Sequence, residues 1–425
     1  MGAVSRAEDW SDQVGIDDVR AAQARLAPVG VRTPLQVNER LSERVGARVL
    51  VKREDLQVVR SYKIRGAFNF IASLGPDALG AGVVCASAGN HAQGVAWSCR
   101  HLGVRGVVFL PRRTPRQKVA RIRALAGELV DLRFEGDTFD EANAAAAAYA
   151  TESGATVVPT FDHPETIAGQ GTIALEVVEE LGGAPDVLVA PVGGGGLIAG
   201  IAVGLHGLGA PTTVLGAQPA GAPAMVRSLE AGHPMTVEPT DAFVDGAVVG
   251  TPGRLTFAIV RDLVDSIVLV DEGRVCTEQL DLYQVEGIVA EPAGALALAA
   301  LDQFSPRLAG RTVVCILSGG NNDVARYDEI IERSLVYEGL KHYFIVSFPQ
   351  RPGALRAFVD ECLGPTDDIV LFEYIKKTSR EYGPALVGIE LAERDDLQPL
   401  LARIEASGLE AQRVAPGTPA FRLLV

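Results

Sequence analysis

The chain has 425 residues, of which 48% are hydrophobic and 22% are charged, and its formal net charge is −14. This length favours two or three domains, and this composition is typical of a folded protein rather than a disordered one. Nucleic acids and anionic membranes are bound by basic surfaces, so the acidic balance argues against both partners. Five scattered cysteines without a CxxC pair, and an N-terminus without an apolar signal segment, predict a cytoplasmic protein without disulfides.

Short apolar segments alternate with helical stretches between about residues 48 and 320. Such alternation predicts βαβ units and an open parallel sheet, which is an α/β fold. The expected strands are 48–54, 82–88, 104–111, 186–192, 212–218 and 312–318, with helices that include 115–127 and 138–154. Residues 187–226 carry no charge, but four consecutive glycines and three prolines argue against a membrane span.

The pattern changes from about residue 339. Expected strands cover 341–349, 368–377, 382–392 and 419–425, and expected helices cover 351–364 and 395–408. The order β-α-β-β-α-β is the ferredoxin-like plan. We therefore expect a separate α+β domain at residues 339–425.

Four short motifs in the first part of the chain matter together: a lysine in a helix-compatible run, and three stretches of small residues at strand ends. They are SYKIRGAFN (61–69), CASAGNHAQG (85–94), VGGGGLIAG (192–200) and VVCILSGGNN (313–322). A desolvated lysine attacks carbonyl carbon, glycines free backbone N–H groups to wrap a phosphate, and helix N-termini favour anions. Each motif alone also has an ordinary explanation: a surface lysine, a strand-to-helix turn or a flexible glycine turn.

In this order and spacing, the motifs resemble those of the fold-type II (tryptophan synthase β-like) pyridoxal-phosphate enzymes over residues 30–330. TPLQVNERLSE, VKREDLQ, HPETIAGQGTIALEV and AEPAGALALAAL add to the resemblance. Within this family the chain is most similar to the biosynthetic threonine dehydratases, and PQRPGALRAF resembles their ACT-like regulatory domain. The resemblance implies a catalytic domain at 1–338, with a smaller lobe at roughly 52–160 inserted in a larger one, and one ACT-like domain at 339–425.

The same resemblance assigns roles around pyridoxal 5'-phosphate. Lys63 would form the Schiff base with the cofactor and later remove the substrate Cα proton. Ser318 would face the pyridine nitrogen; a hydroxyl does not keep that nitrogen protonated, which favours β-elimination over transamination. The cofactor-binding residues implied are Tyr62 against the ring, Lys63, Asn90 on the ring oxygen, Gly193, Gly194, Gly195, Gly196 and Leu197 on the phosphate, and Ser318.

The substrate carboxylate would bind the backbone N–H groups of Ser87, Ala88, Gly89 and Asn90. L-threonine would lose water to give 2-oxobutanoate and ammonia, with L-serine as a second substrate and the cofactor phosphate as the acid for the leaving hydroxyl. Serine racemases carry a second serine where this chain has Ala88, so racemisation is disfavoured. Metal-binding relatives carry an acidic residue where Gln218 stands, so no metal is expected.

Three further expectations concern residues near the ring. Glu291 lies near the cofactor without an assigned role, and Asp245 with Gly246 lines the ring face opposite Tyr62. His91, in the first turn of a helix beside a buried sheet, is expected to be structural.

The C-terminal domain implies regulation. Arg351, Pro352 and Gly353 would form the turn at which an ACT-like domain binds an amino acid, here isoleucine or valine, in a homotetramer. Alternatives are a catabolic serine/threonine dehydratase, a threonine synthase, for which no extra cationic pocket is found, and a non-catalytic amino-acid sensor, which would not need Lys63.

Overall fold

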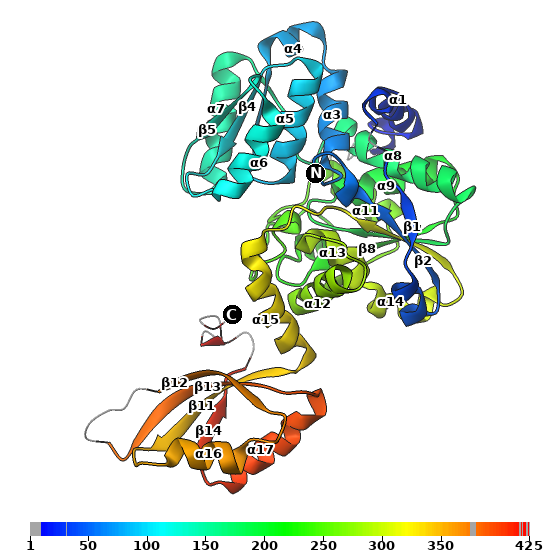
Figure 1. Ribbon diagram of the computed structural model, residues 1–425. Helices are drawn as coiled ribbons and strands as arrows, with labels where there is room; N and C mark the ends of the chain where they lie inside the picture. Colours follow the sequence, from blue (N-terminus) through cyan, green and yellow to red (C-terminus); the bar gives the residue numbers. More distant parts are fainter. Residues whose placement is uncertain are drawn as a thin grey trace, which may run out of the picture. The chain divides into compact units, whose positions relative to one another are not determined.

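The computed structural model describes residues 10–30, 32–374, 380–415, 418, 420–421 and 424. The chain divides into two compact units, Met1–Asp323 and Val324–Val425 (Figure 1). Our expected domain boundary was 338/339, and the helix that separates the two positions, α15 (Tyr327–Glu338), belongs to the second unit.

A six-stranded sheet forms the centre of the larger lobe of the first unit, in the order β1-β2-β10-β7-β8-β9. Only β1 is antiparallel to its neighbour, and the remaining pairs are parallel. Every residue of β7 is buried, as a parallel sheet covered on both faces requires. The strands are β1 (Leu35–Val37), β2 (Arg48–Arg53), β7 (Val187–Pro191), β8 (Thr213–Pro219), β9 (Ser266–Val270) and β10 (Thr312–Leu317).

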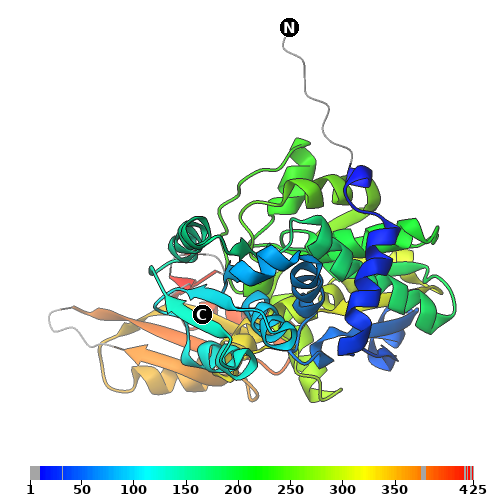
Figure 2. The ribbon, with the colours of Figure 1, turned by 90° about the horizontal axis from the view of Figure 1, so that it is seen from above.

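The helices of this lobe pack closely on the sheet and on each other. A Cβ atom at Gly200 of α9 would collide with the carbonyl oxygen of Ile167 of α8, so the two backbones approach directly. Helix α1, blue in Figure 2, packs on both, with Val19 against Gly171 and Ile16 against Gly207. The helices are α1 (Ile16–Leu26), α2 (Glu39–Val45), α8 (Pro164–Leu181), α9 (Gly196–Gly207), α10 (Ala224–Ala231), α11 (Arg254–Leu263), α12 (Glu272–Gln284), α13 (Pro292–Ala299) and α14 (Leu301–Leu308).

The smaller lobe is built on a four-stranded parallel sheet with the order β5-β4-β3-β6. Its strands are β3 (Val83–Ala86), β4 (Gly106–Leu110), β5 (Val130–Phe134) and β6 (Thr156–Val157). Its helices are α3 (Lys63–Ser73), α4 (Pro76–Ala81), α5 (Asn90–Leu102), α6 (Arg116–Ala126) and α7 (Phe139–Ser153). The expected α/β fold with open parallel sheets is confirmed.

The second unit is an antiparallel sheet with the order β12-β13-β11-β14, and α16 and α17 cover one face (Figure 1). Its elements, β11 (Lys341–Pro349), α16 (Ala354–Cys362), β12 (Asp368–Tyr374), β13 (Tyr382–Glu390), α17 (Leu397–Ala406) and β14 (Glu410–Arg413), follow the expected ferredoxin-like order. Phe348 packs edge-on against Phe358 and Phe372 in the core. The expected last strand, 419–425, falls mostly outside the described residues; the edge strand is β14, whose polar sequence EAQR has no apolar pattern to reveal it.

Short 3-10 helices connect several of these elements. They are η1 (Trp10–Asp12), η2 (Ala27–Val29), η3 (Glu54–Leu56), η4 (Asp245–Ala247), η5 (Val324–Arg326) and η6 (Arg394–Asp396). All five cysteines are buried and free, as expected. Among the helices of the described residues, none has both the length and the apolar character needed to cross a membrane.

Candidate active site

The lysine motif and the serine motif lie side by side, although they are far apart in the sequence. Ser61 forms a β-bridge with Gly319, and the backbone N–H of Tyr62 donates to the carbonyl oxygen of Ser318 at 3.0 Å. Helix α3 begins at Lys63 directly after this bridge. The chain thus holds the start of the lysine helix against the carboxyl end of β10.

The amine of Lys63 points toward the segment that follows β6. Its Nζ donates to the carbonyl oxygen of Thr160 at 3.3 Å and lies 5.3 Å from the centroid of the Tyr62 ring. The next residue, Phe161, packs its ring where a Cβ atom of Gly194 would lie, at 2.6 Å. One short segment therefore contacts both the lysine amine and the glycine loop.

The glycine loop between β7 and α9 accepts no larger residue. A Cβ atom at Gly193 would lie 2.9 Å from the carbonyl oxygen of Ala247, and one at Gly196 would lie 2.7 Å from the Phe161 Cβ. Gly195 has φ +93°, a left-handed conformation that favours glycine. Because the loop leads into the N-terminus of α9, its shape and its backbone N–H groups fit the phosphate of pyridoxal phosphate.

Two residues that the sequence analysis did not single out hold this loop. The hydroxyl of Thr256 donates to the carbonyl oxygen of Gly194 at 2.7 Å. The carboxylate of Asp162 accepts the N–H groups of Arg254, Leu255 and Thr256 at 2.9, 3.0 and 3.0 Å and so caps α11. No sequence signal links residue 162 to a helix that begins far downstream.

Asn90, expected near the cofactor ring oxygen, lies in a cluster of polar side chains in which Glu291 is buried and Asn90 and Asn321 are half-buried. Its Nδ2 donates to Oε1 of Glu291 at 2.6 Å, and its Oδ1 accepts from Nδ2 of Asn321 at 2.7 Å. Burial, together with the charge of Asp245, raises the pKa of Glu291 to about 7, although the hydrogen bond from Asn90 lowers it. Glu291, which the sequence analysis expected near the cofactor without a role, is thus the hydrogen-bond partner of Asn90.

Ser318 lies at the end of β10 and is almost completely buried. Its hydroxyl donates to the carbonyl oxygen of Ala293 at 3.1 Å. A hydroxyl rotates about its C–O bond, so it can turn its proton toward a ring nitrogen or accept with its lone pairs. Ser318 can therefore contact a ring nitrogen as a neutral group.

The loop after β3 offers fewer free N–H groups than its sequence suggests. The N–H of Ser87 donates to the carbonyl oxygen of Phe109, and the N–H of Gly89 donates to the Ser87 hydroxyl, both at 3.2 Å. Within the described residues, the N–H groups of Ala88 and Asn90 have no such partner. These two groups are the ones that remain for a carboxylate.

His91 behaves as a structural residue. Its Nε2 lies 3.0 Å from the carbonyl oxygen of Val158, and the ring is buried. Burial and the charge of Lys63 lower its pKa to about 3. The imidazole is therefore neutral at physiological pH and does not serve as a proton donor there.

The structure describes no group of three or more His, Cys, Asp or Glu residues that is arranged to hold a metal ion. At the position expected to lack a metal ligand, Gln218 accepts the N–H of Val226 at 3.0 Å with its Oε1. The Gln218 side chain therefore stabilises the backbone at the start of α10.

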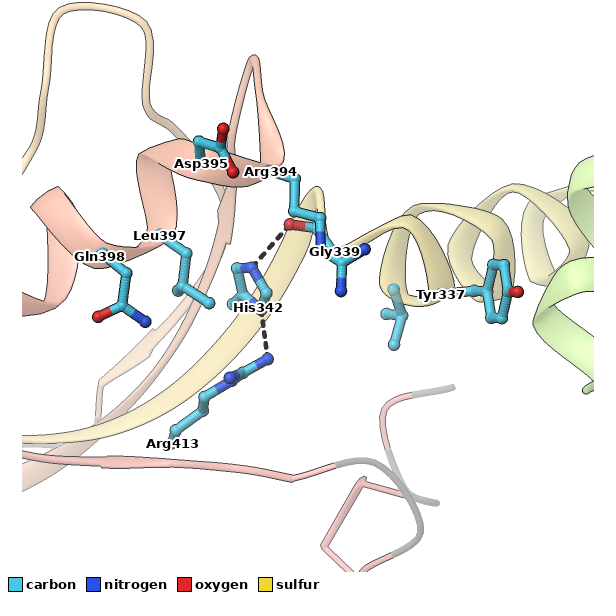
Figure 3. Close-up of a pocket in the computed structure, with 9 residues that line it drawn as sticks. Tyr337, Gly339, His342, Arg394, Asp395, Leu397, Gln398 and Arg413 are labelled. Atoms are coloured by element: carbon cyan, nitrogen blue, oxygen red, sulfur yellow. Dashed lines mark hydrogen bonds between the residues drawn. The ribbon is translucent and has the colours of Figure 1, made fainter.

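The second unit contains a pocket that does not include the expected regulatory turn. Arg351, Pro352 and Gly353 are exposed between β11 and α16, and Gly353 begins α16 with φ +86°. The pocket, about 570 Å³ in volume, lies at the other end of β11 (Figure 3). It is lined by Val336, Tyr337, Gly339, His342, Arg394, Asp395, Leu397, Gln398 and Arg413.

The side chains of this pocket include an arginine held by a buried histidine. Arg413 donates to Nδ1 of His342 at 2.9 Å, so Nδ1 is the acceptor and Nε2 carries the proton, which points to the carbonyl oxygen of Gly339 at 2.9 Å (Figure 3). Burial and the Arg413 charge lower the pKa of His342. The pocket is therefore lined by two arginines, Arg394 and Arg413, and by one carboxylate, Asp395.

Both units resemble known protein families. The profile of the family described as pyridoxal-phosphate dependent enzyme matches residues 26–319, and that of the C-terminal regulatory domain of threonine dehydratase matches residues 332–424. The chain is 56% identical over 410 residues to the biosynthetic L-threonine dehydratase of Mycobacterium tuberculosis, covering 96% of this chain and 95% of the relative. It is 47% identical over 412 residues to that of Bacillus subtilis, covering 97% and 98%.

Solved structures show the same fold. The processed form of threonine deaminase isoform 2 from Solanum lycopersicum matches with a TM-score of 0.70 at 35% identity, covering 75% of this chain and 94% of that one. Maize serine racemase matches with a TM-score of 0.70 at 31% identity, covering 76% and 99%. Together with the two profile matches, these similarities show that the chain belongs to the pyridoxal-phosphate-dependent enzymes and, within them, to the biosynthetic threonine dehydratases with a C-terminal regulatory domain.

Proposed function

We propose that the chain converts L-threonine to 2-oxobutanoate and ammonia by eliminating water. The observation that carries this proposal is the position of the Lys63 amine, between the Tyr62 ring and the segment that packs on the glycine loop. A phosphate held by the loop and an aldehyde near Lys63 define the two ends of one cofactor. The 56% identity to a biosynthetic L-threonine dehydratase supports threonine as the substrate.

The proposed reaction assigns a role to each residue of the site. Bound pyridoxal phosphate supplies an electron-withdrawing ring that acidifies the substrate Cα–H. Lys63 would hold the cofactor through its side-chain amine and would be the base that accepts the substrate Cα proton. Gly193–Gly196 and the N–H of Leu197 bind the phosphate, and Ser318 contacts the ring nitrogen through a neutral hydroxyl.

The substrate carboxylate is placed by the loop after β3. The N–H groups of Ala88 and Asn90 bind it, while those of Ser87 and Gly89 keep the loop in shape through their own hydrogen bonds. Ala88 has no hydroxyl with which to reprotonate Cα from the face opposite Lys63. This favours elimination over racemisation.

The test is the production of 2-oxobutanoate from threonine by the purified protein loaded with pyridoxal phosphate. Lys63→Ala is expected to lose the visible absorption of the covalently bound cofactor and to lower kcat by at least about a thousandfold. Lys63→Arg keeps the charge but cannot bond to the aldehyde, so it should fail as well. A wild-type protein that binds no cofactor and makes no ketoacid would contradict the proposal.

The catabolic serine/threonine dehydratase remains the alternative within the same chemistry. Rates of ketoacid formation from L-serine and L-threonine distinguish the two, together with the response to isoleucine. A strong preference for serine and no effect of isoleucine would favour the catabolic enzyme.

We further propose that the second unit binds isoleucine or valine and that the protein is a cytoplasmic homotetramer. The match to a regulatory domain supports an amino-acid effector. The effector carboxylate would bind either at Arg351–Gly353 or at Arg394 and Arg413, and because β11 separates the two places, substitutions at one do not disturb the other. Measuring inhibition by isoleucine in Arg351→Ala and in Arg413→Ala decides between the two places, and sedimentation gives the oligomeric state. If both variants are inhibited like the wild type, neither place is the effector site.

A further inference from the structure

Asn321, the first asparagine after the SGG sequence, has no role in the function proposed above, yet its side chain contacts Asn90 directly. Its Nδ2 donates to the carbonyl oxygen of Val59 at 2.8 Å and to Oδ1 of Asn90 at 2.7 Å. A backbone carbonyl only accepts, so the atom of Asn321 that faces Val59 must be the amide nitrogen. Val59, which is completely buried, therefore fixes which way the Asn321 amide is turned.

The orientation of the Asn321 amide in turn fixes the orientation of the Asn90 amide. Since Asn321 presents a donor, Asn90 must present Oδ1 to it, and its Nδ2 is turned the other way. One N–H of that nitrogen goes to Oε1 of Glu291 at 2.6 Å. The second N–H is left for a ligand, and at this place the expected ligand atom is the ring oxygen of the cofactor.

We infer that Asn321 is a positioning residue: through its hydrogen bonds to Val59 and Asn90 it holds the Asn90 amide with its N–H, rather than its oxygen, toward the cofactor ring. Glu291 completes the arrangement by accepting the other N–H of Asn90. We call Asn90, Glu291 and Asn321 the amide cluster. The inference rests on the proposed contact between Asn90 and the cofactor.

The groups that surround the cluster explain why an asparagine is needed. The charge of the nearby Asp245 raises the pKa of Glu291, whereas the hydrogen bond from Asn90, the charge of Lys118 and a hydrogen bond from the backbone of Asn321 lower it. A second carboxylate at position 321 would face acceptors on Val59 and Asn90. Only an amide donates to both and leaves the cluster with one titrating group.

The deciding experiment substitutes Asn321→Asp, which keeps size and shape but replaces the donor with acceptor oxygens. The Asn90 amide should then turn over and offer its oxygen to the ring. We expect the apoprotein to bind pyridoxal phosphate about tenfold more weakly, as fluorescence titration would measure. The visible absorption maximum of the loaded protein should also shift, a change that a purely structural role would not produce.

Asn322→Asp is the matched control, because it introduces the same charge at the next position. Asn322 binds the N–H of Asp323 with its Oδ1 at 3.1 Å and does not contact Asn90. We expect wild-type cofactor affinity and spectrum for this variant. If it reproduces the effect of Asn321→Asp, charge alone explains that effect and the inference is wrong.

A double-mutant cycle tests whether Asn321 acts through Asn90. In an Asn90→Ala background, Asn321→Asp should weaken cofactor binding by less than about twofold. A full tenfold loss there, or wild-type affinity and spectrum for Asn321→Asp alone, would overturn the inference. If Asn321→Asp does not fold, Asn321→Ala replaces it, with a smaller loss of affinity expected and no loss contradicting the inference.

The cycle also separates this inference from the function on which it rests. If Asn90→Ala leaves cofactor affinity and absorption unchanged, the proposed contact between Asn90 and the cofactor is wrong. If Asn90→Ala weakens binding but Asn321→Asp does not, only the positioning role of Asn321 fails.

Discussion

Two polar clusters of the first unit balance their charges in opposite ways. The first, which we call the ion cluster, consists of Lys52, Glu54, Arg65 and Glu176. Arg65 is completely buried two residues after Lys63, and it donates to both oxygens of Glu54, each at 2.8 Å, and to both oxygens of Glu176, at 2.6 and 2.9 Å. The second is the amide cluster, in which Glu291 receives hydrogen bonds from the Asn90 side chain and the Asn321 backbone and, within the described part of the chain, forms no ion pair.

The difference appears in the two carboxyl groups. Burial raises the pKa of Glu176, but the charges of Arg65 and Lys52 outweigh burial and leave that pKa below its usual value. Burial and Asp245 raise the pKa of Glu291 to about 7, and the amide of Asn90 lowers it without outweighing them. A glutamate with paired cations stays charged and supports α3, whereas one with amide partners can change its charge near neutral pH, which is typical of functional sites.

The largest expected effect comes from removing the central cation of the ion cluster. Arg65→Met leaves Glu54 and Glu176 buried without the guanidinium that binds both. Breaking a buried ion pair from one side costs about 3–5 kcal/mol of unfolding free energy. Urea unfolding of the apoprotein measures the loss.

The control for Arg65 is Arg20→Met, which removes an exposed arginine paired with Asp17 at 3.4 Å. Exposed pairs contribute about 0–1 kcal/mol, so this variant should unfold like the wild type. Equal losses in the two variants would contradict the expected difference between a buried and an exposed ion pair.

The amide cluster should make stability depend on pH. The pKa of Glu291 is about 7 in the folded protein and near 4.5 when unfolded, so the folded state binds more protons between these values. The stabilisation from the neutral carboxyl is complete below about pH 4.5 and disappears as pH rises through 7, a change of roughly 3 kcal/mol. Subtracting the urea-unfolding profile of Glu291→Gln from that of the wild type isolates this change, and a flat difference between pH 4.5 and 8 would refute it.

These two clusters also show what a sequence reveals and what it conceals. The glycine loop and Ser318 were recognisable because each directly follows a strand of a parallel sheet, where ligands bind. Lys63 stands at the start of a helix and was recognised only from the order of its motif and the three others along the chain. Arg65 stands in the same motif as Lys63, but nothing local shows that its partners are Glu54 and Glu176. Asp162 and Thr256 were missed for the same reason: their contacts arise only when distant loops meet.

Removing one anion from the ion cluster should cost less than removing its central cation. In Glu176→Gln, Arg65 keeps its two bonds to Glu54, and Lys52 keeps Glu180 at 3.7 Å. The remaining anions compensate in part, so we expect a loss of about 2 kcal/mol, between a neutral hydrogen bond and a broken buried ion pair. Unfolding in urea gives the value, and a loss as large as that of Arg65→Met would mean that the cluster does not redistribute its charge.

The smallest predicted effect concerns the charges that face Glu291. Asp245 raises the pKa of Glu291 and Lys118 lowers it, and the two form an ion pair at 2.9 Å. Asp245→Asn should therefore lower the midpoint of the Glu291 titration, and Lys118→Met should raise it. Both side chains of the pair are partly exposed, at 33% for Lys118 and 46% for Asp245, so screening keeps each shift below about one pH unit.

The opposite signs of these two shifts make them their own control. For each variant, the midpoint of the Glu291 titration is taken from the difference between its urea-unfolding profile and that of the same variant carrying Glu291→Gln. At low salt the two midpoints should shift in opposite directions from the wild-type value. At about 1 M salt, where the charges are screened, they should come together. Shifts of the same sign would mean that the variants disturb the packing of η4 rather than its charge. Since Asp245 lies on η4 and Lys118 on α6 of the smaller lobe, opposite shifts would also show that a surface ion pair between the lobes tunes the pKa of Glu291.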